Sequence, residues 1–471
     1  MAVPRFNHRR SRRRASFGIL LIVLYTAALG TRTCAAELEP SLRGYGEDFS
    51  QQYTALTKKI LLSGIELERF SLNYRMESAR QPRFRKLRYF LAQEAGASCG
   101  LAFEITGIDQ FGTGRRHPLQ INQRTLRNSL KAAMTGSIIA GSGSCLELAF
   151  NALQAVKNKR HGFDSASANR YVVSKLKQID ELLAQRDALV AAHTDHPAYE
   201  RAVLEGKILK EMRGAFVNEY AHFNANSRSY LAFQNLFFLL NAGFNAVGAT
   251  AAGLAARALT HPNLNGPANI LFIVSGGLAS IAPWLSTAAK VLMRKHATAV
   301  LTRQLNEKPE FNLTEFAALR KILEEHLPGA EGSLIPSLRA TQRLALYTES
   351  NDLFRKQLDS ETKTMRHLEK IALETSFLGP AIGGALMTQG ILGTVGFYKY
   401  RVRIRKQLNL FFYGSTTGCV GTSMAVVGNA AWFLASLSYE HHLSKQKRLP
   451  AQLIKERLEH IDELERTVRA L

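Results

Sequence analysis

Four long stretches of the chain contain no charged residue, and they constrain the fold more than any other feature. They are residues 229–256, 267–289, 375–397 and 407–439. A helix of about 20 residues crosses the roughly 30 Å hydrocarbon core of a bilayer. The rest of the chain is rich in charge, with 61 basic and 38 acidic residues among 471. The contrast predicts a polytopic membrane protein, because the chain as a whole is not apolar.

The uncharged stretches come in pairs, which predicts hairpins. A short turn with Pro262 and Gly266 separates the first pair, and the basic segment 398–406 separates the second. A weaker hairpin precedes them, with arms at residues 89–108 and 132–156. We therefore expect three apolar hairpins and four to six spans, depending on whether the first hairpin crosses the bilayer.

The weak hairpin contains three carboxylates, which are the leading functional candidates. They are Glu94, Glu104 and Glu147. A carboxylate within a membrane span is costly and usually faces an interior cavity, where it can serve a proton or cation pathway. The alternative is that these residues keep the first hairpin out of the hydrocarbon.

Outside the hairpins, apolar residues recur at three-four spacing, which predicts amphipathic helices. The segments are residues 171–190, 199–223, 316–327, 344–373 and 453–471. No segment alternates with the two-residue period of a strand. We predict an all-α chain whose amphipathic helices pack as an extramembrane bundle.

Spacing along the chain suggests a threefold internal repeat of about 141 residues. The hairpins start near Tyr89, Tyr230 and Glu374, at steps of 141 and 144 residues. The motif Leu-x-x-Ile-Asp-Glu-Leu occurs at 176–182 and again at 458–464. Two unrelated amphipathic helices can also share this motif by chance. The three units would be residues 45–190, 198–327 and 337–471.

The N-terminus has the parts of an export signal. A basic segment from Arg5 to Arg14 precedes the apolar residues 17–30, and small residues follow up to Ala36. We predict a signal peptide of residues 1–36 and a multi-pass membrane protein whose N-terminus is exported after cleavage. An uncleaved signal anchor is the alternative.

Basic residues also indicate an orientation, because short cytoplasmic loops are enriched in Lys and Arg. The tips of the first and third hairpins are basic, at residues 115–131 and 399–406. This pattern places the tips in the cytoplasm and the amphipathic helices outside. A further basic cluster at residues 80–88 precedes the first hairpin, and it favours the inverted orientation instead.

The chain carries a net charge of +23. Its first 36 residues hold seven basic and no acidic residues, so the remaining 54 basic and 38 acidic residues leave +16. On an exported membrane protein, such charge favours anionic lipid head groups over nucleic acid. We expect membrane lipids as partners, proteins bound through the amphipathic helices, and no nucleic acid.

Small and polar residues within the apolar segments predict close helix packing. Pairs of glycines four residues apart lie on one helix face and let another backbone approach. These pairs are Gly96 and Gly100, Gly379 and Gly383, and Gly414 and Gly418. Four amides are expected to face the bundle rather than lipid, through interhelical hydrogen bonds or solute binding: Asn241, Asn245, Gln389 and Asn429.

No motif predicts catalysis, a cofactor or a metal. Glu219 and His222 have the Glu-x-x-His spacing of di-iron bundles, but such a site needs a second copy and the chain has none. Cys99, Cys145 and Cys419 lie in apolar, small-residue segments, which favours packing over disulfides. We expect a protein that is not an enzyme and holds no cofactor or metal.

The leading expectation is a non-catalytic integral membrane scaffold or envelope protein, whose exported helical domain contacts partners or lipid head groups. The alternative is a transporter or channel that uses small-residue spans and intramembrane carboxylates, with sites near the midplane as in repeat-built transporters. A continuous polar cavity would favour transport, and a tightly packed bundle would favour the scaffold.

Overall fold

The computed structural model describes residues 45–79, 84–306, 311–325, 378–446 and 449–470. Every regular element in these ranges is a helix, and the described residues contain no strand, which confirms the all-α prediction. The predicted signal, the amphipathic stretch 344–373 and the first residues of the third hairpin lie outside them. The chain divides into residues 1–50 and 51–471. Apart from the first residues of α2, every described element belongs to the second unit.

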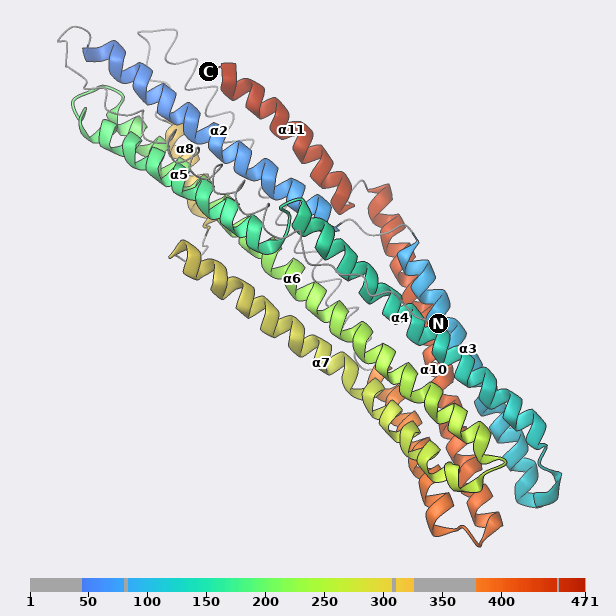
Figure 1. The fold of residues 1–471 in the computed structure, drawn as a ribbon. Coiled ribbons are helices and arrows are strands. Elements are labelled where there is room, and N and C mark those ends of the chain that lie inside the picture. Colours follow the sequence, from blue (N-terminus) through green and yellow to red (C-terminus); the bar gives the residue numbers. More distant parts are fainter. Residues whose placement is uncertain (1–44, 80–83, 307–310, 326–377, 447–448, 471) are drawn as a thin grey trace, which may run out of the picture. The chain divides into compact units, whose positions relative to one another are not determined.

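Most of the elements are long helices, and short turns join α3 to α4, α4 to α5, α5 to α6 and α6 to α7 (Figure 1). The helix Leu378–Lys399 carries no label in the figure. The others are α2 (Tyr45–Ala79), α3 (Arg85–Arg116), η1 (Pro118–Gln120), α4 (Gln123–Arg160), α5 (Ser165–Ala191), α6 (Tyr199–Ala258), η2 (Pro262–Leu264), α7 (Asn265–Leu305), α8 (Leu313–Glu325), α10 (Ile404–Lys445) and α11 (Pro450–Ala470).

Helix α6 joins two segments that the sequence patterns treat as separate. It runs for 60 residues and includes both the amphipathic stretch 199–223 and the uncharged stretch 229–256. Residues 224–228 contain neither proline nor glycine, so nothing interrupts the hydrogen-bond ladder. The amphipathic stretch and the hairpin arm are therefore one continuous helix, α6.

The arms of the first hairpin are longer than predicted. They extend over α3 and α4 rather than 89–108 and 132–156. Pro118 starts the turn η1 beyond the end of α3. The Asn122 side chain accepts hydrogen bonds from the backbone N–H groups of Arg124 and Thr125, both at 3.1 Å, and so caps α4. The apolar pattern underestimated both arms because their ends are polar.

Large apolar side chains form one core away from the hairpin tips. α2, α5, α6, α7, α8 and α11 all contribute to it. Among its most buried members are Leu72, Leu176, Ile208, Phe316 and Ile461. Their removal from water is the main favourable term holding these helices together.

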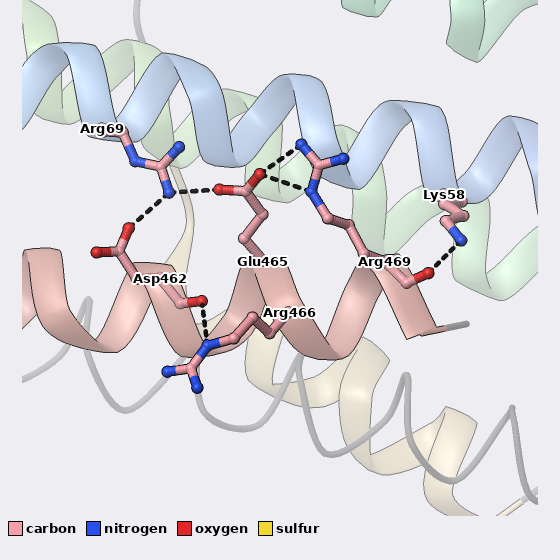
Figure 2. A network of polar contacts seen from close by, with 6 residues as sticks. All are labelled: Lys58, Arg69, Asp462, Glu465, Arg466 and Arg469. Carbon is pink, nitrogen blue, oxygen red and sulfur yellow. Dashed lines mark hydrogen bonds and ion pairs between the residues drawn. The ribbon is translucent and has the colours of Figure 1, made fainter.

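Polar contacts fix α11 along α2 (Figure 2). Arg69 on α2 donates to Asp462 at 2.6 Å and also to Glu465, which in turn pairs with Arg469. Lys58 donates to the backbone carbonyl of Arg469 at 2.6 Å. The pKa of Glu465 lies below its usual value, because Arg69 and then Arg469 donate hydrogen bonds to the ionised carboxylate.

A buried charge cluster lies beneath that surface network. Arg457 on α11 donates to Glu68 on α2 at 2.6 Å and to Glu219 on α6 at 2.8 Å. Arg75 of α2 pairs with Glu219 at 2.9 Å. Burial lowers the pKa of Arg457, but Glu219 and Glu68 raise it by more, so the guanidinium stays charged. Glu219, a carboxylate of the Glu-x-x-His motif, is thus engaged with arginines.

Candidate functional site in the hairpin helices

Four helices are long and apolar enough to cross a membrane: Tyr199–Ala258, Pro262–Leu305, Leu378–Lys399 and Ile404–Lys445. They contain the uncharged stretches 229–256, 267–289 and 407–439, together with residues 378–397 of the third stretch. In the most apolar 18-residue segment of each helix, only 11–28% of the residues are buried. Large apolar side chains such as Leu239, Leu292 and Val427 are exposed instead. An exposed apolar surface of this kind suits lipid as the solvent.

The hairpin helices form a closed circuit of contacts. α3 contacts α4, α4 contacts α6, and α6 contacts α7, which lies beside it (Figure 1). α7 meets the helix Leu378–Lys399 at Gly276 and Gly383, this helix meets α10 at Ala385 and Gly421, and α10 returns to α3. We call these six helices the hairpin ring.

Glycines bring the backbones of α7 and Leu378–Lys399 into contact. A Cβ at Gly383 would lie 2.5 Å from both the carbonyl oxygen of Gly276 and the backbone nitrogen of Ser280. A Cβ at Gly276 would lie 2.5 Å from the backbone nitrogen of Met387. At Gly379 it would lie 2.6 Å from Pro283 Cγ. No larger residue fits these positions without moving a helix.

The other GxxxG glycines also lie in helix contacts. Gly96 faces Gly136 and Ala140 on α4, where a Cβ would lie 2.7 Å from Ala140 Cβ. Gly100 faces Thr422 of α10 at 3.4 Å, which is ordinary contact. Gly414 and Gly418 both face Gln389. Each glycine pair is therefore placed against a neighbouring helix.

Asn241 connects three helices of the ring. Its amide nitrogen donates to Tyr89 Oη at 3.0 Å and Gln93 Oε1 at 2.9 Å on α3, and to Ser144 Oγ at 2.9 Å on α4. Asn245, one turn later on α6, donates to the Asn241 carbonyl at 2.8 Å and is 5% exposed. These polar groups bond to one another inside the ring rather than lining an open path.

The three candidate carboxylates occupy different surroundings. Glu147 is 1% exposed and accepts from Arg85 Nε at 2.6 Å and from Arg88 at 2.5 Å, so its charge is compensated. Glu94 is half-buried with Asn429, also half-buried, against its carboxyl group. Glu147 is therefore paired with two arginines, and Glu94 is paired with an amide.

Glu104 has no cation beside it among the described residues. It is 2% exposed on α3 and accepts from Gln389 Nε2 at 2.6 Å. Ser415 of α10 lies beside the carboxyl group. A Cβ at Gly418 would lie 2.5 Å from Gln389 Oε1 and 2.6 Å from Glu104 Cδ, so glycine is required for the pair to fit. Three helices thus meet at Glu104.

The tips of the three hairpins carry basic residues, which we call the basic collar; all are exposed except Arg115 and Arg127, which are partly buried. Arg401 of the third tip donates to Asn263 of the second at 3.2 Å, and Gly266 packs against Tyr398. The Arg115 guanidinium lies 3.9 Å from the ring centre of Phe412. The collar consists of Arg115, Arg116, Arg124, Arg127, Lys131, Arg257, Lys399, Arg401, Arg403, Arg405 and Lys406. The sequence between and around these residues contains no acid from 110 to 146, 250 to 306 or 375 to 439.

Sequence patterns missed several residues that complete these sites. Arg85 and Arg88 stood out only as an orientation signal, yet they neutralise Glu147. Ser144, Ser415 and Tyr89 carried no signal at all, because single hydroxyl residues are common in apolar helices. Among the described residues, no group of three or more His, Cys, Asp and Glu side chains is placed to hold a metal ion.

Comparisons with protein-family models, with curated proteins and with solved structures yield no match for this chain. The parts of the molecule that bear on function are the hairpin ring, the basic collar and the core formed by α2, α5, α8, α11 and the adjoining parts of α6 and α7, which we call the helical core.

Proposed function

We propose that this protein is a non-catalytic integral membrane scaffold, with the hairpin ring in the bilayer and the helical core outside it. The observation that carries the proposal is the distribution of side chains in the ring, which is the opposite of that in a water-soluble helix bundle. Glycine, serine and amide side chains face neighbouring helices, while large apolar side chains face outward. Interhelical packing by small residues is the mode expected where lipid surrounds the helices.

A carbonate wash of membranes from expressing cells tests the first half of this proposal. An embedded ring keeps the full-length protein in the membrane pellet, whereas a peripheral protein is released. Release of the intact chain would overturn the membrane assignment and with it the scaffold.

We propose the scaffold is built from three repeats, at residues 45–190, 198–327 and 337–471. The circuit supports this, because the second arm of each hairpin contacts the first arm of the next. Glu104, Asn245 and Gln389 are separated by the same steps of 141 and 144 residues, so they occupy equivalent positions in the three proposed repeats. All three are buried polar residues on first arms of hairpins.

We propose that the signal peptide is removed and that the helical core is exported, with the hairpin tips in the cytoplasm. Arg403→Cys at a tip and Glu459→Cys on α11 test this, since both positions are exposed. The variants are made after Cys99, Cys145 and Cys419 are replaced by alanine. An impermeant maleimide on intact cells should label position 459 and not 403. The opposite pattern establishes the inverted orientation.

Anionic lipid head groups are the partner we propose for the basic collar. Each Lys or Arg near an anionic surface contributes about 1 kcal/mol of attraction. Anionic lipid should raise the melting temperature of the protein in nanodiscs more than neutral lipid does. The rise should shrink in a variant with Arg401, Arg403 and Arg405 changed to glutamine. Changing the exposed Lys455 on α11 should not reduce it, and an equal loss in both variants would refute collar binding.

A transporter or channel is the competing proposal, and the buried Glu104 is the observation that favours it. Proteoliposomes of the pure protein distinguish the two. A scaffold leaves proton and alkali-cation leak at the level of empty liposomes, whereas a pathway through the ring raises it. A raised leak that Glu104→Gln abolishes would replace the scaffold proposal.

A further inference from the structure

The hydrogen-bond inventory of Glu104 and Gln389 is incomplete in a specific way. Gln389 Nε2 donates to Glu104 Oε1 at 2.6 Å. The other oxygen of each group, Glu104 Oε2 and Gln389 Oε1, is buried and accepts no hydrogen bond from the residues that the structure describes. An ionised carboxylate can only accept, so it cannot satisfy the amide oxygen. Two buried acceptors would then be left without donors, and each would keep the full cost of losing its hydration.

We infer that Glu104 and Gln389 form a proton-binding site, in which Glu104 Oε2 carries a proton and donates it to Gln389 Oε1. The two groups then make a closed acid–amide pair with one hydrogen bond in each direction. A single proton supplies the donor that both oxygens lack. Gly418 seats the pair against the α10 backbone, because a Cβ there would collide with both groups.

The charges around the pair favour the neutral acid. Residues 378–397 and 407–439, which supply the neighbouring helices, contain no charged side chain. Lys131 on α4 and Asp109 on α3 are exposed. A carboxylate in such surroundings has no cation to offset the loss of hydration.

Glu147 provides an internal contrast. It is as buried as Glu104, but Arg85 and Arg88 both donate to it. Charge-assisted pairing of this kind keeps a carboxylate ionised. Among the described residues, the same residue type thus meets two arginines at one place in the ring and only an amide and a hydroxyl at another.

The proton also links distant parts of the ring. Glu104 and Gln389 are 285 residues apart, on the first arms of the first and third hairpins. Removing the proton would leave an anion facing an amide oxygen, which separates these two helices. Proton occupancy would therefore set how tightly the first and third hairpins pack, a property beyond the scaffold role and independent of it.

Infrared spectroscopy of the full-length protein in lipid nanodiscs tests the inference at neutral pH. A protonated carboxyl group has a carbonyl band separate from carboxylate bands, and it shifts in D₂O. The wild type should show such a band that Glu104→Gln removes and Glu147→Gln leaves unchanged. Glu104→Gln should keep the fold, because two amides can make the same pair of hydrogen bonds.

A second variant tests the inference if the Glu104→Gln protein does not fold. Gln389→Leu keeps the acid but removes its acceptor, so the band should persist and move to the position of a free carboxyl group. Loss of carboxylate bands, rather than of an acid band, in Glu104→Gln would overturn the proposal. A different result is stabilisation of the wild type by Na⁺ but not by choline, with no such effect in Glu104→Gln. That result would show that the site binds a metal cation rather than a proton, and it would overturn the inference.

Discussion

Adjacent glycines on the helix Leu378–Lys399 allow the packing of the hairpin ring to be measured against a built-in control. Gly383 and Gly384 differ only in which way they face. A Cβ at Gly383 would lie 2.5 Å from two backbone atoms of α7, and a Cβ at Gly384 would meet no atom within 4 Å. Alanine should therefore be tolerated less well at position 383 than at position 384.

Two terms set the magnitudes. Replacing glycine by alanine in a helix stabilises it by about 1 kcal/mol, and this term is common to both variants. Overpacking costs about 1–3 kcal/mol and applies only to Gly383→Ala. The backbone atoms of α7 cannot rotate away, so the helices must separate. We expect Gly384→Ala to stabilise the protein and Gly383→Ala to lie about 1–3 kcal/mol below it.

The assay is unfolding of the full-length protein in mixed detergent micelles, followed by loss of helical circular dichroism. Comparing the two variants cancels the helix-propensity term and isolates the packing term. Gly276→Ala and Gly277→Ala on α7 repeat the comparison from the other side of the contact, since only Gly276 closely approaches backbone. Equal stability within each pair would show that α7 and Leu378–Lys399 are not in backbone contact.

Three further perturbations test the remaining contacts. Arg457→Met should destabilise the protein by about 3–5 kcal/mol near neutral pH, because it removes the arginine that pairs with the buried Glu68 and leaves Glu219 with Arg75. Burial already raises the pKa of Glu68. The loss of stability should therefore shrink as the pH falls and the Glu68 carboxyl group becomes protonated. A loss of stability that grows on acidification would contradict the pairing. Glu465→Gln should cost about 0.2–1 kcal/mol, and the cost should vanish below the lowered pKa of Glu465, where its carboxyl group no longer carries a charge. Asn241→Ala should cost about 0.6–2 kcal/mol, measured by the same unfolding assay, and no change would show that its three hydrogen bonds are not formed.

Local sequence pattern was sufficient for the helical class and for the four apolar spans. Both derive from properties read over about 20 consecutive residues, namely hydropathy and the absence of strand alternation. Continuity of α6 was not predicted, although residues 224–228 lack a helix breaker. Sequence pattern was weaker at the first hairpin, where polar ends hid the true length of α3 and α4.

The candidate carboxylates show where sequence reasoning stops. Glu94, Glu104 and Glu147 have equal standing in the sequence, each being an acid in an apolar segment. Their chemistry is set by partners on other helices. Arg85 precedes the first hairpin and looked inconsistent with the expected orientation, but the fold places it against Glu147. No local pattern could assign that role.

By itself, the sequence determined the all-α class and which segments are apolar enough to cross a membrane, because transfer free energy and helical periodicity are properties of neighbouring residues. It did not predict α2 or the full lengths of α3 and α4. Only the tertiary structure decided which helices adjoin and which polar groups meet. The pairing of Glu104 with Gln389 joins positions 285 residues apart. Such a contact depends on three hairpins closing into one ring, with Gly418 leaving the room that the pair occupies.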